Sequence, residues 1–242
     1  MIVLNTDFGL EGPYIGQVKA VLHREAPAVF VVDLFSDLPA FEPQLAAYLL
    51  AAYVGEFEPG TLFLCVVDPG VGGRRRGAVV QADGRWYVGP DNGLFNVIAR
   101  RATDLRWWDI DYRPARLSAS FHGRDIFAPV AAQVARGDAV PGIPVDPALR
   151  LDTGWPGELA RIVYVDRFGN CMTGIRAAAL GDQARLQAQG QTLRRVRTFS
   201  DVAPGQAFWY ENANGLVEIA VNQGAASQEL ALGIGDPVAI GA

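Results

Sequence analysis

The stretch Leu62–Gly72, which reads LFLCVVDPGVG, decides the fold. Its first six residues are all apolar, which is typical of a strand that is buried on both faces of a parallel sheet. The strand ends at Asp68, and the proline and glycines that follow predict a turn that leads to three arginines, Arg74–Arg76. Ligands bind at the carboxyl ends of the strands in open parallel sheets. An acidic residue there, with an arginine nearby, indicates a ligand site, and an ordinary strand-end salt bridge is the alternative.

The chain alternates predicted strands and predicted helices up to about residue 137. The expected strands are Ile2–Leu4, Val29–Leu34, Leu62–Val67, Ala78–Val80, Trp86–Val88 and Leu105–Ile110. The expected helices are Pro13–Arg24, Glu42–Val54, Asn92–Arg101 and Asp125–Arg136. This alternation predicts an α/β domain over residues 1–140, with a mostly parallel sheet that is covered by helices on both faces.

The second half of the chain has a different pattern of predicted secondary structure. Residues 141–158 contain four prolines and three glycines, which predicts a linker with little regular structure. Beyond it, the expected strands are Arg161–Val165, Gln191–Val196, Ala207–Tyr210, Leu216–Val221 and Pro237–Ile240. Helical patterns are nearly absent there, so residues 159–242 are expected to form a small antiparallel, β-barrel-like domain.

Composition narrows the class of partner. The 242 residues are 50% hydrophobic, which excludes a disordered chain. The formal net charge of -5 disfavours a nucleic-acid backbone or an anionic membrane as the main partner and favours a small molecule. The first residues lack the pattern of a signal peptide, and the longest apolar run, Ala46–Val54, is too short to span a bilayer. The two cysteines lie in apolar runs without metal-ligand spacing, so we expect free thiols in a soluble, cytoplasmic protein.

A second strand-end carboxylate occurs in the segment Thr6-Asp7-Phe8-Gly9. The carboxyl ends of parallel strands meet at one edge, so Asp7 is expected to lie near Asp68. An ionised carboxylate accepts two hydrogen bonds, which suits the vicinal diol of a ribose, although a turn or helix-capping role before Gly9 remains open. Neither GxGxxG nor GxxxxGK[ST] occurs, which favours a nucleoside over a dinucleotide.

Four further segments contain polar residues suited to a site. His122, in FHGRD, is a candidate general acid or base, with a structural role equally open. The motif Gly89–Gly93, GPDNG, is more simply interpreted as a helix cap that helps to shape the crevice. Asp166–Asn170, DRFGN, and the aromatic and amide residues within 208–214 suit a purine base, with turn chemistry and core aromatics as the alternative.

In this order, TDFG, VVDPGVG, GPDNG, FHGRD, DRFGN and YEN…GLVEIAVNQG resemble the S-adenosyl-L-methionine (SAM) hydrolases that form adenosine. This family, the SAM hydroxide adenosyltransferases, is related to fluorinase and chlorinase. The similarity covers essentially the whole chain. It implies an α/β domain joined to a β-barrel-like domain, and homotrimers with active sites between subunits. The implied reaction converts SAM and water to adenosine and methionine without a metal or a cofactor.

The resemblance also implies roles for individual residues. It implies that Asp68, Arg75 and His122 bind and activate the attacking water. It assigns SAM binding to Asp7 at the ribose, Phe168 and Asn170 at the adenine, Asp166 at the methionine amine, and Asn222 along the adenine edge, with Phe8 as a further substrate-binding residue. A carboxylate at position 68 would repel a halide ion, which disfavours a halogenase.

Three positions depart from the family pattern near the expected methionine end of the substrate. Gly12 stands where relatives commonly have Asp, Ala213 where Ser is common, and Asn214 where halogenating relatives have Arg. These departures keep a second hypothesis open, that of an adenosine- or SAM-binding protein without turnover.

Overall fold

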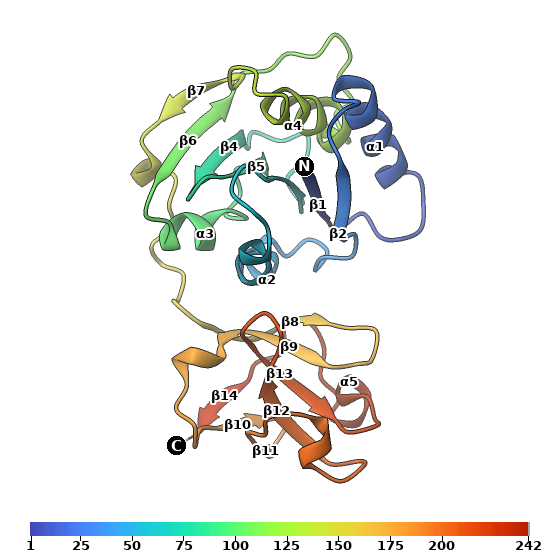
Figure 1. Cartoon of the computed structure of the whole chain (residues 1–242), viewed down its shortest axis with the longest axis vertical. Coiled ribbons are helices and arrows are strands. Elements are labelled where there is room, and N and C mark those ends of the chain that lie inside the picture. The colour runs from blue at the N-terminus through green and yellow to red at the C-terminus, as the bar shows by residue number, and fades with distance from the viewer. Residues whose placement is uncertain (242) are drawn as a thin grey trace. The chain divides into compact units, whose positions relative to one another are not determined.

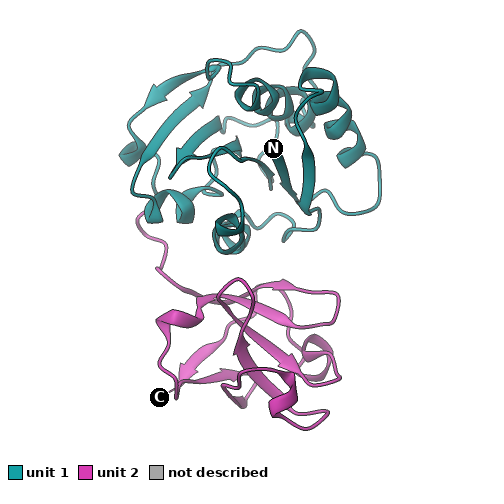
Figure 2. Ribbon diagram, in the orientation of Figure 1, with its two compact units in different colours: residues 1–152 teal, residues 153–242 magenta. Residues whose placement is uncertain are grey.

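The computed structural model describes residues 1–241, and the chain divides into two compact units, residues 1–152 and 153–242 (Figure 2). Each unit has its own hydrophobic core. Within the described residues, no helix has both the length and the apolar character needed to cross a membrane.

A seven-stranded sheet forms the centre of the first unit, in the order β2-β1-β3-β5-β4-β6-β7. The strands are β1 (Ile2–Thr6), β2 (Val31–Phe35), β3 (Leu62–Val66), β4 (Gly77–Ala82), β5 (Arg85–Pro90), β6 (Leu105–Ile110) and β7 (Gly142–Val145). The pairings make β1, β2, β3, β5 and β6 run in one direction, while β4 and β7 run in the other. This confirms the predicted α/β class with a mostly parallel sheet.

Helices cover both faces of this sheet (Figure 1). The helices are α1 (Tyr14–Glu25), α2 (Pro43–Tyr53), α3 (Asn96–Arg101) and α4 (Ala128–Ala135). Side chains of β1 and β3 on one face, such as Leu4 and Leu64, share a buried cluster with Leu22 of α1 and Val130 of α4. Figure 1 shows α2 and α3 on the opposite face. The continuous apolar character of β1 and β3 therefore follows from burial on both sides.

Two helices, α3 and α4, begin three or more residues later than the sequence predicts. Asn92 was the expected start of α3, but Gly93 has φ +95°, a left-handed conformation that interrupts a helix, and α3 begins at Asn96. The helix expected from Asp125 is preceded by one π-helical turn, η2 (Gly123–Phe127), before α4. Such turns occur frequently at functional sites.

Strand β7 lies within residues 141–158, where the sequence predicts little regular structure. It pairs antiparallel with β6, and Pro144 lies opposite Trp108. Proline cannot donate a backbone hydrogen bond, so it is tolerated at the edge of a sheet, and β7 is an edge strand. The expectation of an irregular linker is therefore wrong for Gly142–Val145.

The second unit contains two antiparallel sheets, in the orders β11-β10-β14 and β12-β13-β9-β8. The elements are β8 (Leu159–Val165), β9 (Cys171–Arg176), β10 (Arg185–Ala188), β11 (Gln191–Arg194), β12 (Ala207–Glu211), β13 (Leu216–Val221), α5 (Ala226–Glu229) and β14 (Ala239–Gly241). Isolated bridges, Arg161 with Pro237 and Arg195 with Trp209, join the two sheets at both edges. The arrangement is barrel-like, as predicted, although β9 and β10 were not foreseen.

Gly89 of β5 should be essential for packing of the first unit. A Cβ atom at this position would lie 2.1 Å from the carbonyl oxygen of Cys65 in β3, which is backbone and cannot move aside easily. We expect Gly89→Ala to lower the free energy of unfolding by about 1–3 kcal/mol, measured by urea denaturation. Gly16→Ala in α1 is the matched control, because a Cβ there meets nothing within 4 Å and alanine favours helix. Equal stability of Gly89→Ala and wild type would contradict this packing.

Candidate active site

The two predicted strand-end carboxylates lie at the same edge of the sheet. Strands β1 and β3 are parallel neighbours, with Thr6 opposite Val66. Asp7 follows β1, and its backbone N–H donates to the carbonyl of Val66 at 3.1 Å. Asp68 comes two residues after Val66, so the strand register brings both carboxylates to the carboxyl edge of the sheet.

Arg75 donates two hydrogen bonds to the carboxylate of Asp68. Arg75 Nε donates to Oδ1 at 2.8 Å, and Nη2 donates to Oδ2. The side chains of Asp68 and Arg75 are only 5% and 12% exposed. The intervening turn packs closely, because a Cβ on Gly72 would lie 2.5 Å from the carbonyl oxygen of Ala119. This bidentate, buried pair is the strong form of an arginine–carboxylate contact.

His122 completes a contiguous group with this pair. Arg75 Nη2 lies 2.9 Å from His122 Nδ1. A guanidinium group can only donate, so Nδ1 must accept, and the proton of the neutral imidazole lies on Nε2. Burial lowers the pKa of His122, and the positive charge of Arg75 lowers it further, with partial opposition from Asp68 and Asp125. The predicted Asp–Arg–His set is therefore in direct contact, with a neutral histidine.

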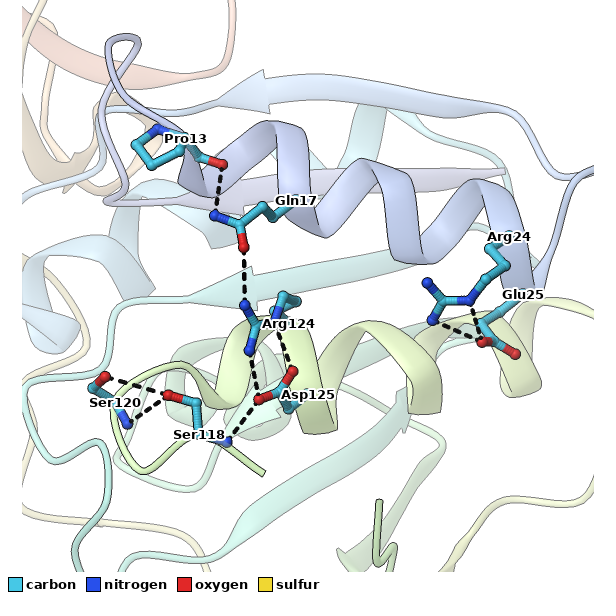
Figure 3. Close-up of polar contacts among 8 residues, drawn as sticks. All are labelled: Pro13, Gln17, Arg24, Glu25, Ser118, Ser120, Arg124 and Asp125. Atoms are coloured by element: carbon cyan, nitrogen blue, oxygen red, sulfur yellow. Dashed lines mark hydrogen bonds and ion pairs between the residues drawn. The ribbon is translucent and has the colours of Figure 1, made fainter. Parts of the chain in front are cut away.

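The turn that carries His122 is fastened by the rest of its motif (Figure 3). Asp125 accepts from the backbone N–H of Ser118 at 2.7 Å, and Arg124 donates to both carboxylate oxygens of Asp125. Arg124 also donates to Gln17 of α1 at 2.9 Å. The hydrogen bond from Arg124 lowers the pKa of Asp125. These contacts tie the segment before His122 to α1, a positioning role that the sequence did not reveal.

A cavity of about 340 Å³ opens beside these residues. It is lined by Asp7, Phe8, Tyr14, Ala40, Phe41, Val66, Asp68, Val71, Ser120, Phe121, His122 and Gly123. Phe8 packs against Tyr14 and Phe121, with ring centroids 5.9 and 5.8 Å apart. Gly123 is required by this packing, since a Cβ there would lie 2.9 Å from the Phe8 ring. The predicted residues Asp7, Phe8, Asp68 and His122 thus line one cavity.

Asp7 is a partly buried acid on the cavity wall. Burial raises the pKa of its carboxyl group, and the nearby charge of Asp68 acts in the same direction. The backbone dipoles of Phe41 and of Asp7 itself lower the pKa and partly oppose this shift. The cavity therefore holds two acidic groups close enough to influence each other.

Asn92 also acts on this edge of the sheet, although the sequence suggested mainly a helix cap. Its Nδ2 atom donates to the carbonyl of Val67 at 2.8 Å, directly before Asp68. Its Oδ1 atom accepts from Leu94 at 3.4 Å, a weak capping bond. Asn92 thus fixes the start of the turn that leads from Asp68 to Arg75. Only the three-dimensional pairing of β5 with β3 shows this.

The predicted adenine residues lie in the second unit. Asp166, Phe168 and Asn170 line a separate cavity of about 550 Å³, together with Phe199 and Tyr210 among others. The Asp166 carboxylate accepts from the backbone N–H groups of Phe168 and Asn170, both at 2.9 Å, and from Asn170 Nδ2 at 3.0 Å. Asp166 therefore shapes this turn, and Phe168 presents its ring to the solvent.

Two other residues near this cavity have internal partners. Asn222 donates from Nδ2 to the carbonyl of Val202 at 2.8 Å, so its side chain amide stabilises the local turn. Glu218 is only 2% exposed and accepts from Tyr210 Oη at 2.6 Å and Asn212 Nδ2 at 2.8 Å. Burial raises the pKa of Glu218. Glu218 is the only charge in an apolar strand, which is the sequence signal for this network.

Within residues 1–241, no three His, Cys, Asp or Glu side chains gather where they could hold a metal ion.

Comparison with known proteins covers both units. A family model described as the SAM hydroxide adenosyltransferase N-terminal domain matches residues 2–143, and one described as the C-terminal domain of the same family matches residues 160–239. The (R)-S-adenosyl-L-methionine hydrolase of Thermus thermophilus is 41% identical, over 96% of both chains. That of Salinispora tropica is 37% identical, over 97% of this chain and 95% of the relative. A fluorinase from Nocardia brasiliensis is 22% identical, over 92% of this chain and 90% of the relative.

Solved structures agree with this assignment. An uncharacterized conserved protein from Thermotoga maritima superposes with a TM-score of 0.86 and 31% identity, over 99% of both chains. A conserved hypothetical protein from Thermus thermophilus gives a TM-score of 0.80 and 35% identity, over 99% of this chain and 98% of that one. The sequence motifs, both halves of the fold and the sequence relatives point to one conclusion: the chain belongs to the SAM hydroxide adenosyltransferase family.

Proposed function

We propose that this protein hydrolyses SAM to adenosine and L-methionine. The observation that carries the proposal is the contact of Asp68, Arg75 and His122 beside a cavity that Asp7 also lines. In the reaction, the oxygen of water bonds to the ribose 5′ carbon while the bond from that carbon to sulfur breaks. The sulfur keeps the electron pair, so methionine leaves as a neutral thioether, and the water gives up one proton.

The charges of the site suit this substrate. SAM carries a positive sulfonium centre, and the cavity wall contains the carboxylates of Asp7 and Asp68. With Arg75 paired to Asp68 and a neutral His122, the negative charge of Asp7 is left over to attract the sulfonium. A halide nucleophile would be repelled by the same carboxylates, which supports water as the attacking group.

The hydrogen bonds divide the proton chemistry between two residues. His122 Nδ1 accepts from Arg75, so Nε2–H is the group able to donate to the oxygen of the attacking water. A doubly protonated imidazole would lose the contact with Arg75. Asp68 is therefore the proton acceptor, with Arg75 fixing its orientation and His122 positioning the water. General-base assistance of this kind contributes about 10²–10⁴-fold in rate.

The remaining predicted residues would hold the rest of SAM. Asp7 and Phe8 would bind the ribose, Phe168 and Asn170 the adenine, and Asp166 the methionine amine. The side-chain amide of Asn222 already donates to the carbonyl of Val202. We therefore propose that Asn222 lines the adenine edge through its backbone. The related hydrolases are named for the (R) form, so we propose that this protein prefers the (R) sulfonium epimer. Incubation with each epimer, followed by mass spectrometry of adenosine and methionine, tests this.

We further propose a cytoplasmic homotrimer that needs no metal or cofactor, with each active site formed between subunits. The supporting observation is that the water-handling residues lie in the first unit and the adenine candidates in the second. Light scattering of the purified protein tests the trimer, and an assay in EDTA tests metal independence.

Asp68→Asn should lower kcat by about 10²–10⁴-fold. The substitution keeps one oxygen for Arg75 but removes the charged proton acceptor. Adenosine formation from SAM is the readout, and circular dichroism verifies that the variant is folded. Asp182→Asn is the control, because Asp182 is an exposed carboxylate paired with Arg195 in the second unit. A folded Asp68→Asn protein with the wild-type rate would reject the proposed mechanism.

The pH profile should report the neutral state of His122. Because the pKa of His122 is lowered from its ordinary value of 6.5, the neutral form of the ring predominates at that pH, and the ring becomes half protonated only at a lower pH. We expect kcat/KM to fall at acidic pH, with the midpoint of the fall below pH 6.5. In His122→Asn, whose amide can still donate, the remaining fall should shift to more acidic pH. An acid limb with its midpoint above pH 6.5 in the wild type would be incompatible with this assignment.

Two inactive variants should complement each other if the sites lie between subunits. Asp68→Ala removes the proton acceptor of the first unit, and Phe168→Ala removes the exposed ring of the second. We expect co-expressed variants to regain activity at a SAM concentration where each alone is inactive, because some sites combine two intact units. Co-expression of two differently tagged Asp68→Ala chains is the control. No recovery in verified mixed oligomers would show that each site lies within one chain.

A further inference from the structure

Phe41 occupies a backbone conformation that normally belongs to glycine. Residues 39–42 form a turn that is closed by the N–H of Glu42 donating to the carbonyl of Pro39 at 3.2 Å. Phe41 is the third residue of this turn and has φ +65°. Glycine or asparagine usually fills that position, because a side chain on a bulky residue is strained there. The turn alone would be better served by glycine, so it does not account for the phenyl ring.

The ring of Phe41 is also unusually accessible. The residue is 74% exposed, although most large aromatic side chains of this unit are buried or packed against one another. It lines the cavity that contains Asp7, Asp68 and His122. A strained backbone that holds an apolar ring in solvent at the wall of a cavity is typical of a binding element.

The backbone of Phe41 acts on the same site. Phe41 and Asp7 line the same cavity, and the backbone of Phe41 lowers the pKa of the Asp7 carboxyl group, against the effect of burial. The carbonyl of Thr6, just before Asp7, accepts from the N–H of Leu38 at 3.0 Å, which anchors the other end of this loop to β1. The loop is thus hydrogen-bonded to the end of β1, where Asp7 lies. The positive φ of Phe41 determines the direction of both its N–H and its ring.

We propose that Phe41 is a nucleoside-binding residue, whose ring packs against the ribose and adenine while its N–H orients Asp7 toward the ribose hydroxyls. This inference rests on the proposed function, because Asp7 is the proposed ribose ligand. Phe41 lines the same cavity wall as that ligand, which places its exposed ring beside the proposed ribose site. The contact is made to the part that SAM and adenosine share. Phe41 should therefore affect binding of substrate and product alike, and leave bond cleavage nearly unchanged.

Phe41→Gly separates the ring from the turn. Glycine relieves the strain and keeps the N–H for Asp7, so the melting temperature should rise by about 2 °C. Loss of the ring should raise the Kd for adenosine and the KM for SAM by a similar factor, roughly tenfold, with kcat nearly unchanged. Phe41→Tyr keeps an aromatic ring and should bind adenosine as tightly as the wild type.

Gln189→Gly is the matched control for backbone relief. Gln189 also has a positive φ, +47°, but lies in the turn between β10 and β11 of the second unit. It should raise the melting temperature in the same way without changing Kd or KM. A purely structural Phe41 predicts that Phe41→Gly behaves as this control does.

Calorimetry with adenosine and steady-state kinetics with SAM decide the outcome. Weaker adenosine binding by a more stable Phe41→Gly protein supports the inference, even if the wild type binds adenosine without hydrolysing SAM, which would reject only the proposed reaction. Unchanged adenosine affinity in Phe41→Gly overturns the inference while hydrolysis by the wild type stands. A rise in KM for SAM without any change in adenosine affinity also overturns it, since the ring would then contact the methionine half. A wild type that binds neither compound rejects both.

Discussion

The site depends on the bidentate ion pair between the guanidinium of Arg75 and the carboxylate of Asp68. Both side chains are almost fully buried, so neither charge is tolerable without the other. The same guanidinium reaches His122 and thereby fixes which ring nitrogen carries the proton. One planar group thus sets the orientation of the acid, the tautomer of the histidine and the distance between them. The glycine-rich turn and the hydrogen bond from Asn92 to Val67 support this geometry, because they fix the backbone from which Asp68 and Arg75 extend.

The sequence predicts the parts of this site that depend on local pattern. The apolar run before Asp68 identifies a buried strand, and its end identifies the edge where ligands bind. Asp7 follows by the same argument, because parallel neighbouring strands end together. Alternating strands and helices likewise predict the first unit's class. The antiparallel strands of the second unit are predictable from the turn residues between them. Strand β9 is an exception, because its apolar and polar residues do not alternate clearly enough to identify a strand.

Features that depend on long-range pairing could not be predicted. Asn92 meets Val67 only because β5 lies beside β3, and Arg124 meets Gln17 only because the turn before α4 packs against α1. The positive φ of Phe41 is opposite to the preference of its residue type, so propensity argues against it. Strand β7 contains a proline that forbids a central strand, and its edge position becomes visible only in the sheet order. Local rules fail in this chain where distant contacts outweigh them.

The charge of the cavity connects binding, selectivity and release in the proposed reaction. Before cleavage, the sulfonium adds one positive charge to a wall with two carboxylates, one guanidinium and a neutral imidazole, and the local sum approaches zero. After cleavage, the thioether sulfur and the adenosine are both neutral, so the attraction that held the substrate is lost. Before SAM binds, the same wall carries a net negative charge and disfavours an anionic nucleophile. In the proposed reaction, the negative charge of Asp7 therefore favours binding of the cationic substrate over binding of its neutral products.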